Sequence, residues 1–233
     1  MKASITHLLT GATAALILAL PVGAQAPAGQ FTVAARSGYA DYGRSTSLEG
    51  APFLGLDAEY GLHKYVGIGT SLFVSRPKTT AMDFLTTQTY GVSTAGDTTF
   101  IYGASQAVNV LNGELLASLR YPVGRFTPFL IGGFGMYGMI FDPQVNRGNK
   151  SSSGTSASVG GGAAVRLSER AGLQCDVRNL TFFGYNRRDL DPSGGRNANT
   201  IFAEDFALPP ARSKSVNSLV FTIGFRYVPG GEI

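Results

Sequence analysis

Histidine and cysteine are scarce in this chain, and this restricts the chemistry it can perform. Among 233 residues there are two histidines and one cysteine. His7 falls in an apolar N-terminal segment, so His63 is the one histidine of the chain that follows. Ser/His/Asp catalysis and clustered His/Cys metal binding need more of these side chains, and Cys175 alone cannot close an internal disulfide. We therefore expect no enzymatic activity, no cofactor and no metal site.

Long apolar runs are missing as well. The N-terminal run from Leu8 to Leu20 is shorter than the roughly 20 residues of a membrane-spanning helix, and no later run reaches about 18. Lys2 precedes this run and Ala24-Gln25-Ala26 follows it, a pattern typical of a secretory signal peptide. We predict a signal peptide over residues 1–26, with cleavage near 24–26, and a single domain over residues 27–233. Any membrane insertion of that domain must use strands.

Charge is sparse, and the charges that are present form no cluster typical of a binding site. Charged residues make up 15% of the chain, whereas soluble domains average about 25%. No basic cluster is interleaved with aromatic residues, so nucleic acid is not an expected partner. We interpret the acids near the end of the chain as solvated loop charge rather than as metal ligands: Asp189, Asp191, Glu204 and Asp205.

Strict alternation is the clearest pattern that is present. Between Ser215 and Tyr227, one face carries Leu219, Phe221, Ile223, Phe225 and Tyr227, and the other carries Ser218, Val220, Thr222, Gly224 and Arg226. A period of two with one apolar face predicts a half-buried strand. The apolar face of such a strand points inward in a soluble sandwich and outward to lipid in a membrane barrel.

Eight segments have this period, and the lengths of their connections alternate. The segments cover residues 31–42, 54–62, 66–74, 108–121, 126–141, 157–167, 173–178 and 215–227. Connections after the second, fourth and sixth are short, whereas those after the third, fifth and seventh are long and polar: Pro77–Gln106, Asp142–Ser156 and Asn186–Lys214. This asymmetry predicts an all-β fold, an eight-stranded antiparallel up-and-down transmembrane β-barrel with short periplasmic turns and long extracellular loops.

The alternation also predicts which charged side chains face the barrel interior. These are five cations and four anions: Arg36, Asp57, Glu59, Glu114, Arg120, Arg166, Asp176, Arg178 and Arg226. In a soluble barrel so many inward charges would be prohibitively costly. In an eight-stranded membrane barrel the lumen is just wide enough for side chains to fill, so near-balanced charges can pair and plug it. A charged conduction path is the alternative interpretation.

Aromatic residues predict two girdles on the lipid face, because amphipathic rings favour the headgroup zone. At the short-turn end we expect Tyr60, Tyr121, Phe129, Phe225 and Tyr227, and at the long-loop end Tyr39, Tyr137, Phe141 and Tyr185. Gly133 to Gly138 matches the dinucleotide pattern G-x-G-x-x-G, but no helical pattern follows it. We interpret these glycines as bulges or kinks in a barrel strand.

Two stretches resemble a known family. Leu115-Leu116-Ala117-Ser118-Leu119-Arg120-Tyr121-Pro122, continued by residues 124–133, and Val159 to Leu173 resemble the fourth-to-fifth and sixth-to-seventh hairpins of small outer-membrane β-barrel proteins of the OmpA-like and OmpX-like type. The resemblance implies a bacterial outer-membrane location. It also implies contacts with outer-membrane lipid, lipopolysaccharide and the barrel-insertion machinery.

Three functions follow from these patterns as hypotheses. The first is a monomeric structural or surface-interaction barrel whose interior is plugged by paired charges and whose long loops carry specificity. The second is a narrow porin-like channel for small solutes. The third, a soluble periplasmic ligand-binding β-barrel, is disfavoured by the charged inner face.

Overall fold

The fold was described from a computed structural model of the whole chain. The residues that it describes are 28–80, 85–90, 98–103, 105–141, 151–190 and 215–229. The expected signal peptide, residues 1–26, lies outside this range, as do Asp191, Glu204 and Asp205. Among the described residues, no helix is long and apolar enough to cross a membrane.

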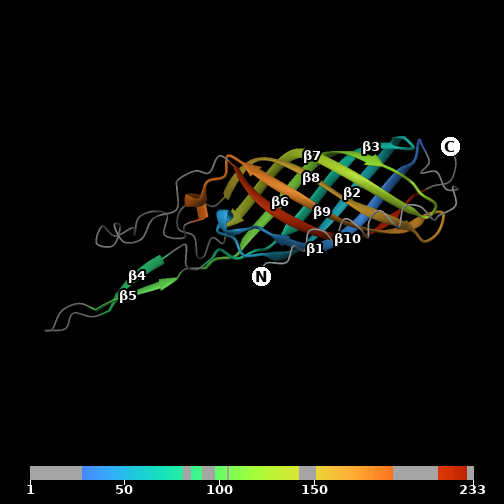
Figure 1. Cartoon of the computed structure of the whole chain (residues 1–233). Helices are drawn as coiled ribbons and strands as arrows, with labels where there is room; N and C mark the ends of the chain where they lie inside the picture. The colour runs from blue at the N-terminus through green and yellow to red at the C-terminus, as the bar shows by residue number, and fades with distance from the viewer. Residues whose placement is uncertain are drawn as a thin grey trace, which may run out of the picture.

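Eight strands close into one antiparallel barrel, as predicted (Figure 1). Each barrel strand pairs with the barrel strands before and after it in the chain, and β1 pairs with β10 to close the ring. The barrel strands are β1 (Phe31–Asp41), β2 (Ala51–His63), β3 (Val66–Ser75), β6 (Val108–Arg120), β7 (Phe126–Phe141), β8 (Ser151–Arg166), β9 (Ala171–Phe183) and β10 (Ser215–Tyr227).

Short turns join the strands at one end of the barrel, which we call the turn end. Val123 and Phe126 exchange backbone hydrogen bonds of 2.7 and 3.0 Å. Gly124 between them adopts a φ of 61°, a left-handed conformation that glycine adopts without strain. At the β8–β9 turn, the Leu167 and Ser168 amides donate to the Ala171 carbonyl at 2.9 and 3.0 Å. These local bonds set the register of each hairpin.

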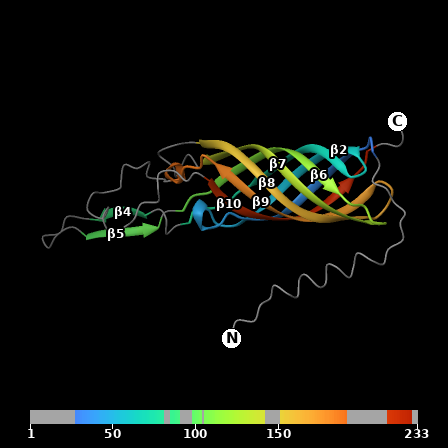
Figure 2. The same ribbon diagram turned by 45° about the horizontal axis from the view of Figure 1, so that its top comes forward.

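The opposite end, which we call the loop end, carries the longer connections. The β1–β2 connection contains a 3-10 turn, η1 (Arg44–Thr46), and a second one, η3 (Arg187–Leu190), follows β9. The segment predicted as the loop Pro77–Gln106 contains two further strands, β4 (Leu85–Tyr90) and β5 (Thr98–Gly103). They pair only with each other and project beyond the loop end (Figure 2). The eight-strand barrel is unaffected by this addition.

The sixth barrel strand is longer than the sequence predicted. β8 begins at Ser151, so residues 151–156, which were assigned to a loop, belong to the sheet. They pair with the end of β7, for example Gly135 with Ser156 and Met139 with Ser152. The serine-rich composition suggested a loop, but a long partner strand supplies the backbone hydrogen bonds that decide strand formation.

Apolar side chains cover the outer surface of the barrel. Leu115 is 71% exposed and Ile223 is 59% exposed, while their sequence neighbours point inward. Large exposed apolar residues occur on all eight barrel strands. So large an apolar surface is typical of a barrel wall in contact with lipid.

The predicted aromatic girdles are only partly correct. Tyr39, Tyr60, Tyr121, Phe225 and Tyr227 lie on the outer surface. Phe129, Tyr137, Phe141 and Tyr185, which were assigned to the lipid face, are buried inside. In β7 the exposed positions are the even ones, Leu130, Phe134, Met136 and Ile140. Apolar and aromatic residues occupy both faces of this strand, so hydropathy alone did not reveal its orientation.

An apolar cluster fills the lumen at the loop end. Its members are contributed by strands around the barrel and by the segments that follow β1 and β9. They include Tyr42, Phe53, Phe73, Val108, Val110, Tyr137, Met139, Phe141, Leu180, Phe182, Tyr185 and Leu190. Phe182 and Tyr137 meet edge to face with ring centroids 4.7 Å apart. This aromatic plug occupies the part of the interior next to the long connections.

Candidate functional site

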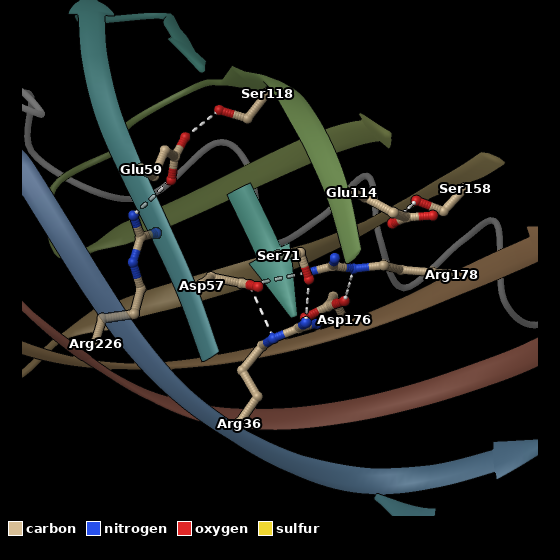
Figure 3. Close-up of polar contacts among 10 residues, drawn as sticks. All are labelled: Arg36, Asp57, Glu59, Ser71, Glu114, Ser118, Ser158, Asp176, Arg178 and Arg226. Atoms are coloured by element: carbon tan, nitrogen blue, oxygen red, sulfur yellow. Dashed lines mark hydrogen bonds and ion pairs between the residues drawn. The ribbon is translucent and has the colours of Figure 1, made fainter. Parts of the chain in front are cut away.

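A charge network spans the middle of the lumen (Figure 3). Asp57 of β2 is at its centre, with Oδ2 2.9 Å from Arg36 Nε and 3.3 Å from an Arg178 guanidinium nitrogen. Arg178 Nε in turn lies 2.6 Å from Asp176 Oδ1. Arg36 also donates to the Ser71 hydroxyl at 2.5 Å. All these side chains are buried. A buried charge without a partner is strongly unfavourable, and here each charge is compensated by a neighbouring charge of opposite sign.

The strand register brings these residues to one level of the barrel. Arg36 pairs with Gly55 and Ala34 pairs with Asp57 across the β1–β2 ladder, so Arg36 and Asp57 are diagonal neighbours on the inner face. Glycine provides room for the arginine side chains. A Cβ on Gly160 would meet Arg178 backbone and side-chain atoms, and one on Gly55 would approach the Arg36 guanidinium. Small inward residues therefore allow long arginines to lie flat within a narrow lumen.

A second group surrounds Glu59 closer to the turn end. Glu59 Oε2 lies 3.2 Å from Arg226, and Glu59 Oε1 lies 3.8 Å from Arg120 Nε. The Ser118 hydroxyl donates to the same carboxylate. Gly67 faces all of these groups, because a Cβ there would collide with Glu59, Arg120 and Ser118. One carboxylate is thus shared by arginines from β6 and β10, on well-separated parts of the wall.

The remaining predicted interior charges have different surroundings. Glu114 is buried and accepts a hydrogen bond of 2.7 Å from the Ser158 hydroxyl. Arg166 is exposed at the end of β8 and lines the mouth of the lumen at the turn end. It forms no ion pair with any residue that the structure describes. Arg166 is at the end of β8 on the same face as the buried Ala164, so it faces the mouth of the lumen but is not enclosed as the other predicted interior charges are.

The loop end is held together by hydrogen bonds above the aromatic plug. The Tyr185 hydroxyl donates to the Thr46 carbonyl at 2.6 Å, and Gln106 Nε2 donates to the Leu190 carbonyl at 2.6 Å. Burial raises the pKa of Tyr185 well above its usual value, so the hydroxyl stays protonated as a donor. Arg187 donates to the Ser47 hydroxyl, and Tyr42 shares a hydrogen bond with Ser75. These contacts connect η1, η3 and the β3–β6 segment across the end of the barrel.

The few residues with catalytic potential lie away from these groups. His63 is exposed at the end of β2, and Cys175 is exposed on the outer face of β9. Asp189 accepts hydrogen bonds of 2.8 Å from Ser152 and Asn186, so it is more ordered than the solvated loop charge that was expected. Within the described ranges, no group of three or more His, Cys, Asp or Glu side chains is placed to hold a metal ion.

A family model described as the outer membrane protein beta-barrel domain matches residues 10–206. The chain belongs to this family. Membership assigns this barrel to the bacterial outer membrane and agrees with the resemblance to OmpA-like and OmpX-like proteins. The short connections of the barrel are accordingly periplasmic and the long ones extracellular.

Several solved outer-membrane barrels are similar in fold. Neisserial surface protein A is 11% identical, with 84% of this chain and 96% of that protein covered and a TM-score of 0.49. OprG from Pseudomonas aeruginosa is 17% identical, with 90% and 99% covered and a TM-score of 0.45. Ail, the attachment invasion locus protein of Yersinia pestis, is 10% identical, with 86% and 100% covered and a TM-score of 0.43. Identities this low carry no inference about function, and no curated protein matches the chain.

Sequence reasoning about this outer-membrane barrel missed the aromatic plug. The signal was present in β9, where Leu180 and Phe182 share the parity of Asp176 and Arg178. The predicted seventh strand stopped at Arg178, and extending its alternation to Phe183 would have placed both apolar side chains inside. The interior of this barrel is therefore charged in its middle and apolar at the loop end.

Proposed function

We propose that this protein is a plugged outer-membrane barrel that serves as a structural or surface-interaction protein. The observation that carries the proposal is the double filling of its lumen. The aromatic plug occupies the extracellular end, and the Arg36–Asp57–Arg178–Asp176 network lies below it. A solute on a path through the barrel would have to displace both.

The charge balance of the interior supports a static plug. Four buried or part-buried arginines face four acids inside the barrel, so the lumen has no net charge to attract ions of one sign: Arg36, Arg120, Arg178 and Arg226 against Asp57, Glu59, Glu114 and Asp176. Breaking a buried ion pair typically costs about 3–5 kcal/mol. Spontaneous opening of the described network is therefore expected to be rare.

With transport disfavoured, the extracellular connections are the proposed interaction surface. Loops placed on a rigid scaffold are where binding specificity is usually found. The hydrogen bonds from Tyr185 to Thr46 and from Gln106 to Leu190 fix the bases of these connections to one another. We further propose that the barrel acts as a monomer in contact with lipid and lipopolysaccharide after assembly by the insertion machinery. A closed sheet supports the monomer proposal because it has no free strand edge for pairing.

Conductance in planar bilayers tests the plug. The purified protein should give no steady conductance, or only rare small openings, while retaining the shift in gel mobility on heating that is typical of folded barrels. Stable, large conductance from heat-modifiable protein would contradict the plugged barrel and favour the narrow channel. The plugged barrel and the channel share the same fold, so conductance of folded protein is the property that separates them.

A further inference from the structure

The periplasmic mouth of the lumen is a cavity with an unusual lining. It has a volume of about 350 Å³ and is bounded by the β6–β7 and β8–β9 turns and the end of β10. This volume lies at the lower end of the roughly 300–1,000 Å³ of small-molecule sites. We call it the vestibule. Its charged lining consists of Arg120, Arg166, Arg170, Arg226 and Glu169.

The arginines of the vestibule outnumber the acids available to them. Glu59, at the inner limit of the vestibule, is 3.2 Å from Arg226 and 3.8 Å from Arg120, so one carboxylate serves two guanidinium groups. Neither Arg166 nor Arg170 forms an ion pair with any carboxylate in the part of the chain that the structure describes. Among the described residues, four cations thus face two anions, Glu59 and Glu169, which leaves an excess of two positive charges.

Geometry strengthens the effect of this excess. The vestibule lies at the periplasmic end of the barrel, and Arg120 and Arg226 of its lining are paired with Glu59 on the lumen side. A one-sign cleft with low-dielectric walls concentrates field lines and raises the local concentration of counter-ions. Guanidinium groups also match the planar or tetrahedral oxygens of carboxylate and phosphate with two parallel hydrogen bonds.

We propose that the vestibule is a binding site for a small oxyanion, one that carries phosphate or carboxylate groups with at least two negative charges. Arg166 and Arg170 bind the anion at the rim, and Arg120 and Arg226 supply positive potential from the inner wall. The Thr127 hydroxyl, from the start of β7, is a further polar group in the lining. This site goes beyond the proposed plug function, because its rim residues Arg166 and Arg170 take no part in the charge balance of the lumen.

Calorimetric titration with pyrophosphate and with citrate tests the site. The refolded full-length protein is held in an alkyl maltoside, whose headgroup contains no phosphate, at roughly 0.15 M salt so that long-range attraction is screened. We expect saturable binding of at least one of the two anions. Arg166→Gln and Arg170→Gln should each weaken it about threefold, as for solvent-exposed charge pairs, and the double variant about tenfold if the effects add.

Arg125→Gln is the matched control. It removes the same charge at the same end of the barrel, in the β6–β7 turn, from a residue outside the vestibule lining. If the anion binds in the vestibule and is not simply attracted by the positive charge of this end of the barrel, the affinity of this variant should stay within about 1.5-fold of that of the unmodified protein. Equal weakening by Arg125→Gln, or no saturable binding of either anion to the unmodified protein, overturns the proposal. Retained heat-modifiability of each variant shows that the barrel is folded.

A competition experiment identifies the source of the anion. Short-chain phosphatidic acid presents a phosphate monoester, with about two negative charges, on a lipid headgroup. If it displaces the bound anion from the unmodified protein, the site accepts lipid headgroups. If it does not, the site is specific for soluble oxyanions. Either result supports the vestibule as an oxyanion site once saturable binding has been shown.

Discussion

Arg178 of β9 and Asp57 of β2 meet across the lumen, with a guanidinium nitrogen 3.3 Å from Oδ2, although β1 and β10 separate their strands in the barrel wall. The two residues are 121 positions apart in the chain. Their contact links opposite parts of the wall directly, in addition to the backbone ladder. The same carboxylate binds Arg36, so Asp57 is the residue on which the network depends most.

Asp57→Asn should destabilise the barrel by about 3 kcal/mol, because it leaves two buried arginines without their shared counter-charge. Equilibrium urea titration in detergent or lipid vesicles measures the change in the free energy of unfolding. Asp41→Asn is the control, since Asp41 is exposed at the end of β1 and lies outside the network. Equal stability of the two variants would show that the network contributes little.

Phe182→Ala should open part of the aromatic plug. Phe182 is fully buried, meets Tyr137 edge to face and stacks on Tyr185, so its truncation should cost about 3–5 kcal/mol. It should also raise the frequency of openings in planar bilayers. Phe183→Ala removes the same ring from the adjacent lipid-facing position, which is 38% exposed, and should affect both measurements less. A larger effect from Phe183→Ala would reverse the assigned orientation of β9.

Ile223→Arg should destabilise the barrel by about 2–4 kcal/mol, because it places a cation in contact with the bilayer interior. Tyr227→Arg, on the same face of β10 but at its periplasmic end, should cost about 0–1 kcal/mol. Thr222→Arg, on the inward face of β10, does not report on contact with lipid. Thr222 is only 6% exposed, so an arginine there would overpack a filled lumen. Refolding titrations into vesicles measure the free energy of unfolding of all three variants. Equal costs for Ile223→Arg and Tyr227→Arg would contradict the placement of Ile223 deeper in the bilayer than Tyr227.

Gly135→Ala should destabilise the barrel by about 1–3 kcal/mol through a backbone clash. A Cβ at this position would collide with the Gly113 carbonyl and with Glu114 of β6. Gly138→Ala, in the same strand, meets nothing within 4 Å and should be close to neutral. Refolding yield and heat-modifiability compare the two variants. The register of β7 runs without a shift, so the predicted bulge is absent there, and Gly135 instead allows β6 to approach closely.

The sequence by itself determined the number of barrel strands, the short and long ends of the barrel, and most of the lipid-facing surface. Residues such as Leu115 and Ile223 were assigned correctly because alternation is a local, period-two property of each strand. Five aromatic residues of the outer surface followed from the same rule. Once the inward face of each strand was assigned, the sequence also predicted that glycines would leave room for long arginines, as Gly160 does for Arg178.

Tertiary structure alone decided how the interior is filled. Strand register and barrel closure decide which acid pairs with which arginine. They bring Asp57 to Arg178, two residues so far apart in the chain that no local sequence pattern predicts their contact. In β7, glycines and aromatics on both faces gave no contrast in hydropathy, so Tyr137 and Phe141 were assigned to lipid although they lie inside. Arg166 lies at the exposed mouth of the lumen because β8 ends at this residue. Period two determines the face on which a side chain lies, but only the closed barrel determines what that face encloses.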